Sequence, residues 1–161
     1  MGKEQPRILI TGASGYIGGR LLQRLLEKNM DAIAMVRRPD EFSKRFPIKH
    51  EVRYGDALNK ESLITALKDI DIAFYLIHSL NNDHDFVDLE VQSIRHFIAA
   101  AKHQNVKKII YLGGLFDTDQ NLSPHLQSRK IVGDIIRNSD IPSITFRASI
   151  ILGSGSLSFE M

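Results

Sequence analysis

The amino-acid sequence predicts a doubly wound α/β fold, in which helices cover both faces of a parallel sheet. Short apolar runs alternate with segments of helical periodicity about six times along the chain, which is typical of parallel α/β domains. A glycine-rich turn joins the first apolar run to the first helical segment. Because crossovers between parallel strands are right-handed, we expect about six strands in the order 3-2-1-4-5-6.

The expected strands are the apolar runs themselves. They cover residues 7–10, 32–36, 51–54, 72–77, 108–112 and 144–148. The runs 72–77 and 108–112 are those expected of buried strands, covered on both faces of the sheet.

Helices are expected where apolar residues recur at every third or fourth position. The first covers 17–25, a short one covers 62–67, and another opens at Ser123-Pro124. The longest carries one apolar stripe, made of Val87, Val91, Ile94, Ile98 and Ala101. Each of these helices therefore has one face to bury against the sheet.

Composition excludes several classes of protein. The 161 residues are 43% hydrophobic and 25% charged, as in an ordinary soluble domain. Lys and Arg number 21 against 19 Asp and Glu, and a net charge of +2 gives no reason to expect nucleic acid or a membrane surface as a partner. The absence of cysteine excludes disulfides, cysteine-based zinc sites and a thiol nucleophile. With no signal peptide and no apolar run of bilayer length, a cytoplasmic protein is expected.

The most informative motif is the run Thr11-Gly12-Ala13-Ser14-Gly15-Tyr16-Ile17-Gly18 between the first strand and the first helix. Gly12 permits a tight turn, Gly15 lets a pyrophosphate approach the backbone, and Gly18 lets the helix pack closely on the sheet. The helix N-terminus offers N–H groups and a positive dipole end to phosphates. The motif therefore predicts dinucleotide binding; the alternative is a glycine-rich turn without a ligand.

The GxxGxxG spacing resembles the short-chain dehydrogenase/reductase superfamily in its extended and atypical branches, including NmrA-like and epimerase/dehydratase-like proteins. Tyr54-Gly55-Asp56-Ala57-Leu58 resembles the family's adenine-side motif, which implies that Asp56 bonds the adenine amino group. Ile77-His78-Ser79 lies where the family's loop passes the nicotinamide-side ribose. Tyr111-Leu112-Gly113-Gly114-Leu115 matches the segment that carries a serine in the family. The resemblance covers residues 7–155.

The end of the second expected strand bears on the choice of cofactor. An NAD site would place Asp or Glu there to hold the ribose 2′-OH, but this chain has Arg37 and Arg38. Two guanidinium groups suit the 2′-phosphate of NADP. The sequence therefore favours NADP over NAD, with Arg37 as the better candidate; the alternative is a solvated pair on an ordinary turn.

The resemblance also implies a Tyr-x-x-x-Lys pair for acid/base chemistry, and no tyrosine of this chain is followed by lysine four positions later. His125 and Arg129 have that spacing in the matching helix. A histidine exchanges protons near neutral pH, so His125 is a candidate acid/base, whereas Arg129 would bind ribose or phosphate without giving up its proton. A helix-start role and a non-catalytic cofactor contact remain open for His125.

Three other sets of residues are candidates for a metal site or a ligand contact. Asp83-His84-Asp85 with Asp88 has no spacing of a known metal site, so no metal is predicted. His78 should lie at the carboxyl end of a strand, where ligands bind in α/β sheets, and a purely structural role is equally open. Arg147 lies within the last apolar run, where it indicates either a ligand near the sheet edge or a pair with a helix carboxylate.

These observations predict an NAD(P)-binding oxidoreductase or epimerase/dehydratase-like enzyme acting on an unidentified small molecule. The alternative is a non-catalytic NADP(H)-binding sensor of NmrA-like type. Residues 1–161 are expected to form the Rossmann domain at the N-terminal end of a longer chain, with 153–161 starting a further segment. A homo-oligomer is possible, because helices on the sheet faces can serve as dimer contacts.

Overall fold

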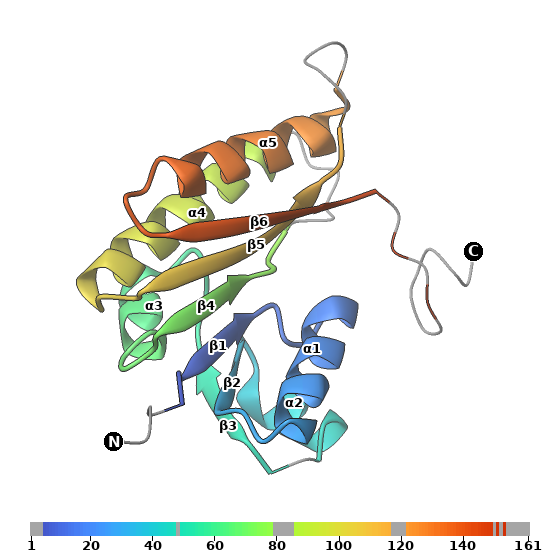
Figure 1. The fold of residues 1–161 in the computed structure, drawn as a ribbon, viewed down its shortest axis with the longest axis vertical. Coiled ribbons are helices and arrows are strands. Elements are labelled where there is room, and N and C mark those ends of the chain that lie inside the picture. Colours follow the sequence, from blue (N-terminus) through green and yellow to red (C-terminus); the bar gives the residue numbers. More distant parts are fainter. Residues whose placement is uncertain are drawn as a thin grey trace.

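The computed structural model describes residues 5–47, 49–78, 86–116, 122–149, 151 and 153. Six parallel strands form one sheet in the order β3-β2-β1-β4-β5-β6, which confirms the predicted fold class (Figure 1). In chain order the elements are β1 (Ile8–Thr11), α1 (Tyr16–Glu27), β2 (Ala32–Val36), α2 (Pro39–Arg45), β3 (Glu51–Tyr54), α3 (Lys60–Ala66), β4 (Ile72–Tyr75), α4 (Phe86–His103), β5 (Lys108–Gly114), α5 (Pro124–Arg137) and β6 (Ser143–Ala148).

Helices cover opposite faces of the sheet (Figure 1), and two apolar clusters hold them there. On one face, Leu22 of α1 and Phe42 of α2 pack with Ile10 of β1. On the other face, α3, α4 and α5 pack against residues that include Leu9 and Tyr111. Burial of this apolar surface is the main favourable contribution to the stability of such a domain.

Helix α2 is absent from the sequence-based prediction. It has seven residues and buries one of them, Phe42, so it is too short to show an apolar stripe. Pro39 occupies its first turn, where a missing N–H costs nothing. The ring of Phe42 stacks on that of Phe46 with 5.6 Å between centroids. The arginine pair, for which a solvated pair on an ordinary turn is the alternative to NADP binding, directly precedes a helix.

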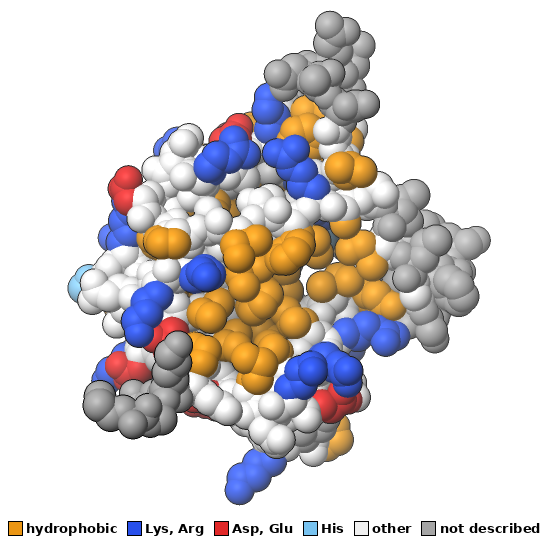
Figure 2. Space-filling view, viewed as in Figure 1, with side chains coloured by type: hydrophobic (Ala, Val, Ile, Leu, Met, Phe, Trp, Pro, Cys, Tyr) orange, Lys and Arg blue, Asp and Glu red, His pale blue; other side chains and the backbone are white. Residues whose placement is uncertain are grey.

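The expectation that β4 and β5 are covered on both faces is wrong. Every residue of β1 and β2 is buried, whereas buried and half-buried residues alternate along β4 and through most of β5. Phe74, Ile110 and Ile144 form a row across β4, β5 and β6, and within the described chain no helix covers this row. Phe146 beside it is 59% exposed. Figure 2 shows the resulting apolar patch.

Helix α4 buries more than its predicted stripe. Ile94, Ile98 and Ala101 are buried as expected, but Val87 is only half-buried and Glu90 is almost completely buried. A buried carboxylate is costly unless it is hydrogen-bonded, so Glu90 marks a special position. No helix among the described residues is long and apolar enough to cross a membrane.

Candidate nucleotide-binding and catalytic site

The glycine loop after β1 is shaped by contacts that leave no room for side chains. Gly12 has a φ of 65°, in the left-handed region that favours glycine, and a Cβ there would lie 3.0 Å from the carbonyl oxygen of Leu76. A Cβ on Gly18 would overlap the carbonyl oxygen of Gly12. The Thr11 hydroxyl accepts a hydrogen bond from the Leu76 N–H at 3.0 Å, which ties the end of β1 to β4. The backbone at this edge is therefore closely fixed.

The N-terminus of α1 lacks a protein cap. Gly15 at the N-cap position supplies no side-chain hydrogen bond, and the first turn holds no acidic residue. The first helical hydrogen bond runs from the Gly19 N–H to the Gly15 carbonyl at 2.9 Å, so the N–H groups of the preceding turn have no acceptor within the helix. Ser14 beside them is exposed. This arrangement suits a phosphate group.

Tyr16 and Ile17 open α1 and are half-buried. The guanidinium of Arg20 lies over the Tyr16 ring, 4.6 Å from its centroid. A Cβ on Gly153 would overlap the Tyr16 hydroxyl oxygen. The chain beyond β6 therefore returns to the start of α1, next to the predicted nucleotide loop.

The predicted adenine-side residues follow β2, which lies next to β1 in the sheet, and β3, which lies next to β2. Arg37 is exposed and makes no ion pair with any described residue. Arg38 pairs instead with Glu41 in the first turn of α2, at 3.3 Å. Asp56 accepts a hydrogen bond from the Leu58 N–H at 3.0 Å, and Ala57 is buried. Of the two arginines, Arg37 is the one left without an ionic partner.

At the other end of the sheet edge, the sequence-predicted residues His78, His125 and Arg129 come close together. Partial desolvation lowers the pKa of His78; the charges of Arg129 and His125 lower it further, and Glu90 opposes them. Ile77 before it is half-buried. The His125 ring packs on Phe86 with 4.8 Å between centroids, and its residue surface is exposed.

Gly114 at the end of β5 leaves room for side chains of α5 to pack on the sheet. A Cβ on Gly114 would lie 2.8 Å from Leu126 and 3.2 Å from the Cδ atom of Arg129. The Arg129 stem thus packs over the end of β5, at the segment where the resembling family carries a serine. This positions a cation beside His78.

Sequence reasoning missed two residues of this cluster, Glu90 and Ser128. The Ser128 hydroxyl donates a short hydrogen bond to the Glu90 carboxylate, and both residues are buried, with 2% and 7% of their surface exposed. The sequence does carry a signal for them, because Glu90 and Ser128 are polar residues at helix positions that face the core. The apolar stripe of the sequence predicts only apolar residues on the inward face of α4.

Neither buried tyrosine nearby replaces the missing acid/base. Burial, reinforced by the charge of Glu90, raises the pKa of Tyr75 far above its usual value. Burial also raises the pKa of Tyr111 to about 12, with Arg129 opposing and Glu90 adding to the shift. The Tyr111 hydroxyl donates to the Arg129 carbonyl at 3.2 Å. Both phenols therefore stay protonated near neutral pH.

Ser79 and the Asp83-His84-Asp85 loop fall outside the described residues, and the described part of the chain holds no group of three metal-ligating side chains. Arg147 pairs with no described carboxylate; its guanidinium lies 5.1 Å from the centroid of the Phe116 ring.

The residues from the glycine loop to β6 match a known protein family. A family model described as NAD(P)H-binding matches residues 12–147, from the glycine loop to β6. The chain belongs to this NAD(P)H-binding family. Family membership confirms the NAD(P)-binding character that the glycine loop predicts.

Two solved structures illustrate the relationship. Triphenylmethane reductase from Citrobacter sp., solved in complex with NADP(H), is 29% identical with a TM-score of 0.78, over 89% of this chain and 49% of that protein. An enzyme from Bordetella bronchiseptica, solved in complex with NAD+, is 18% identical with a TM-score of 0.79, over 98% and 60% of the two chains. The second likeness shows the fold alone.

Among curated proteins, cinnamoyl-CoA reductase 1 of Oryza sativa subsp. japonica is 25% identical over 130 residues, which is 75% of this chain and 38% of that enzyme. The chain thus spans less than half the length of this relative and of the Citrobacter reductase. Two of these three proteins, from Citrobacter sp. and Oryza sativa, are named as reductases.

Proposed function

We propose that this chain forms the NADP(H)-binding part of a reductase of the atypical short-chain class. The observation that carries the proposal is Arg37, a guanidinium without an ionic partner among the described residues, placed where β2 ends beside the glycine loop. A 2′-phosphate accepts bidentate hydrogen bonds from such a group. The complex of Citrobacter triphenylmethane reductase with NADP(H) supports the same choice of cofactor.

The residues present fit a dinucleotide. Gly12 and Gly18 form a cradle that a Cβ would fill, and the uncapped start of α1 would hold the pyrophosphate. The Asp56 carboxylate would accept a hydrogen bond from the adenine amino group, and Arg129 would hold the nicotinamide-side ribose. The bound cofactor would supply a hydride.

Reduction of a carbonyl-like substrate also needs a proton, and His125 is the group that we assign to donate it. Its residue surface is exposed beside His78, whereas the nearby tyrosines are buried with raised pKa values. His78, with its lowered pKa, is a neutral imidazole near neutral pH and would orient the substrate by a hydrogen bond. Arg129 stays charged throughout and holds its position without exchanging protons.

Cofactor choice is tested by titrating NADPH and NADH into the protein while following nicotinamide fluorescence. Arg37→Gln should weaken NADPH at least about tenfold and leave NADH nearly unchanged, since only NADPH carries the 2′-phosphate. The matched control is Arg24→Gln, which removes the same charge from the far end of α1, where Arg24 pairs with Glu27. If Arg37→Gln weakened the affinity for NADPH and NADH equally, Arg37 would not bind the 2′-phosphate.

Catalysis is tested separately by His125→Ala, with NADPH oxidation followed against a panel of quinones, whose reduction takes up a proton together with the hydride. Loss of a general acid should slow turnover by roughly 10²- to 10⁴-fold while leaving NADPH affinity intact. Unchanged turnover would exclude His125 as the proton donor. NADPH binding with no turnover on any acceptor would favour the sensor alternative.

A further inference from the structure

A small pocket lies between α5 and the edge of the sheet formed by β5 and β6. Its volume is about 90 Å³, and it lies on the face against which α5 packs, because Tyr111 and Thr145, which are paired in the sheet, both line it. Pockets for drug-sized ligands span roughly 300–1,000 Å³. The space therefore suits a group of a few atoms rather than a nucleotide.

The pocket collects positive charge from two elements. Helix α5 contributes Arg129, Lys130 and Arg137, and β6 contributes Arg147. The one carboxylate among the lining residues is Asp134. Four cations around so small a space repel one another unless an anion lies between them.

Ion pairing inside the pocket leaves part of this charge uncompensated. Asp134 pairs with Arg137 at 3.1 Å, which occupies the single carboxylate. Arg129 and Arg147 make no ion pair with any described residue. The guanidinium of Arg147 is thus available to a ligand, and Arg129, which we assign to the nicotinamide-side ribose, adds its charge to the pocket.

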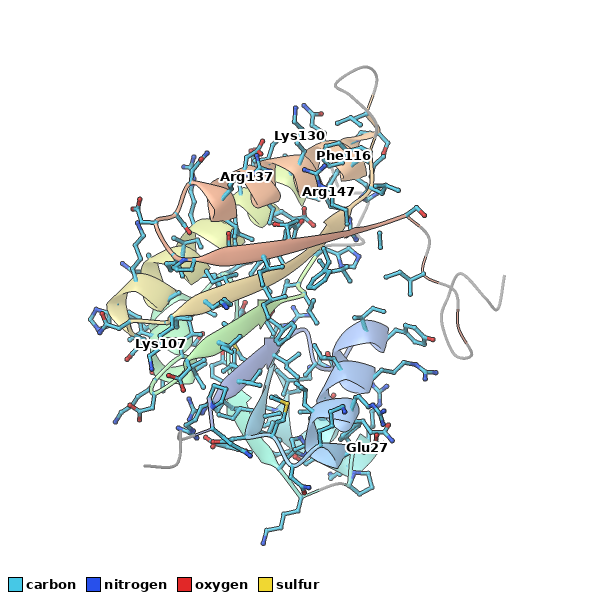
Figure 3. The ribbon with its side chains drawn as sticks, in the orientation of Figure 1. Glu27, Lys107, Phe116, Lys130, Arg137 and Arg147 are labelled. Atoms are coloured by element: carbon cyan, nitrogen blue, oxygen red, sulfur yellow. The ribbon has the colours of Figure 1, made fainter. Side chains whose placement is uncertain are left out.

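The position of Arg147 is fixed by its neighbours. Its guanidinium lies over the Phe116 ring, and its partner in the sheet register is Gly113, which has no side chain to fill the space beside it. Figure 3 shows Lys130, Phe116 and Arg147 gathered at the same end of α5, far from Glu27 on α1. The aromatic contact orients the guanidinium without neutralising its charge.

We propose that this pocket is a binding site for an oxyanion, the phosphate or carboxylate group of a small molecule, held by Arg147 and attracted by the charge of Arg129 beside it. Planar guanidinium groups bind both kinds of anion through paired hydrogen bonds. The site is separate from the glycine loop, which lies at the end of β1. Its existence does not depend on which nicotinamide nucleotide the loop takes.

The test is a titration of the ¹⁵N-labelled protein with inorganic phosphate at constant ionic strength, followed by NMR. Phosphate should shift the amides of Gly113, Gly114 and Arg147 saturably. Arg147→Gln should weaken this binding about tenfold, whereas Arg24→Gln, which changes the net charge equally, should leave it unchanged. Acetate titrated in parallel distinguishes the two ligands, since the tighter anion identifies the group that the pocket takes.

A second variant guards against misfolding of Arg147→Gln. Arg137→Gln leaves the Asp134 charge unpaired in the pocket and should weaken phosphate binding, and its side chain is 60% exposed, so the fold should tolerate it. Amide shifts confined to residues 12–18, or equal weakening in Arg24→Gln, would overturn the proposal. Because NADPH affinity is measured independently, failure here and failure of the cofactor assignment give different results.

Discussion

The two halves of the sheet build their parts of the site differently. In the half formed by β1, β2 and α1, the backbone of the glycine loop forms the candidate phosphate site, with the Arg37 side chain beside it, and both strands are buried throughout. In the half formed by β4, β5 and β6, side chains from α4, α5 and the strand ends make it, and one face of the sheet is uncovered by any described helix. A backbone site is encoded in contiguous residues, whereas a side-chain site depends on how distant elements pack.

The largest expected effect contrasts burial in the two halves. Leu22 of α1 is fully buried, so Leu22→Ala should lower the free energy of unfolding by about 2–5 kcal/mol, through lost transfer energy and the cavity left behind. Phe146 of β6 is 59% exposed, so Phe146→Ala should change that energy by less than about 0.5 kcal/mol. Urea denaturation measures both. A loss from Phe146→Ala comparable to that from Leu22→Ala would mean that this face is covered in the folded protein.

A smaller effect contrasts two glycines. Gly18→Ala places a Cβ against the Gly12 carbonyl, which is backbone, so the loop must move. We expect a loss of about 1–3 kcal/mol in the free energy of unfolding, together with weaker NADPH binding. Gly114→Ala meets only the side chains of Leu126 and Arg129, which can turn aside, and should cost less than about 1 kcal/mol.

The same two measurements, urea denaturation and nucleotide titration, decide this pair. If Gly114→Ala weakens NADPH as strongly as Gly18→Ala, the backbone loop is not the dominant contact. If neither variant changes NADPH affinity, Gly18 serves the packing of α1 alone and Gly114 that of α5.

The same contrast explains what the sequence could predict. The order of strands and the glycine loop depend on local periodicity and on one contiguous motif, so both could be recognised from the residues. Helix α2 could not, because seven residues with one buried side chain show no period. The incomplete cover of β4 and β5 was also missed, since an apolar run looks alike whether one or both faces are packed.

The side-chain cluster was only partly predictable. His125 and Arg129 were found because they share a helical spacing that matches a family motif. The Glu90–Ser128 hydrogen bond joins α4 to α5 across 38 residues of sequence, so no spacing along one helix indicates it. The pocket around Arg147 likewise exists only once α5 lies over β5 and β6.

The smallest expected effect is electrostatic and lies in the β4–β6 half. Because desolvation, Arg129 and His125 together hold the pKa of His78 below its ordinary 6.5 despite Glu90, the unfolded chain binds the proton more readily than the folded one. The contribution of His78 to stability is therefore complete above about pH 6.5 and is lost as the pH falls through the folded pKa. His78→Gln should lose less unfolding free energy than the wild type between about pH 7.5 and about pH 5, as measured by urea denaturation.

His78 is exposed, and solvent screens the charges around it. The difference in unfolding free energy between His78→Gln and the wild type is therefore small. NMR titration of the imidazole therefore gives the sharper readout. Arg129→Gln should raise the pKa of His78 toward its ordinary value, because one of the two nearby positive groups is gone. A control variant, Lys102→Gln, removes a cation that pairs with Asp140 at 2.9 Å and should leave that pKa unchanged. An unaltered His78 titration in Arg129→Gln would show that the guanidinium does not face the imidazole, and Arg129 would then be free to serve the α5–β6 pocket alone.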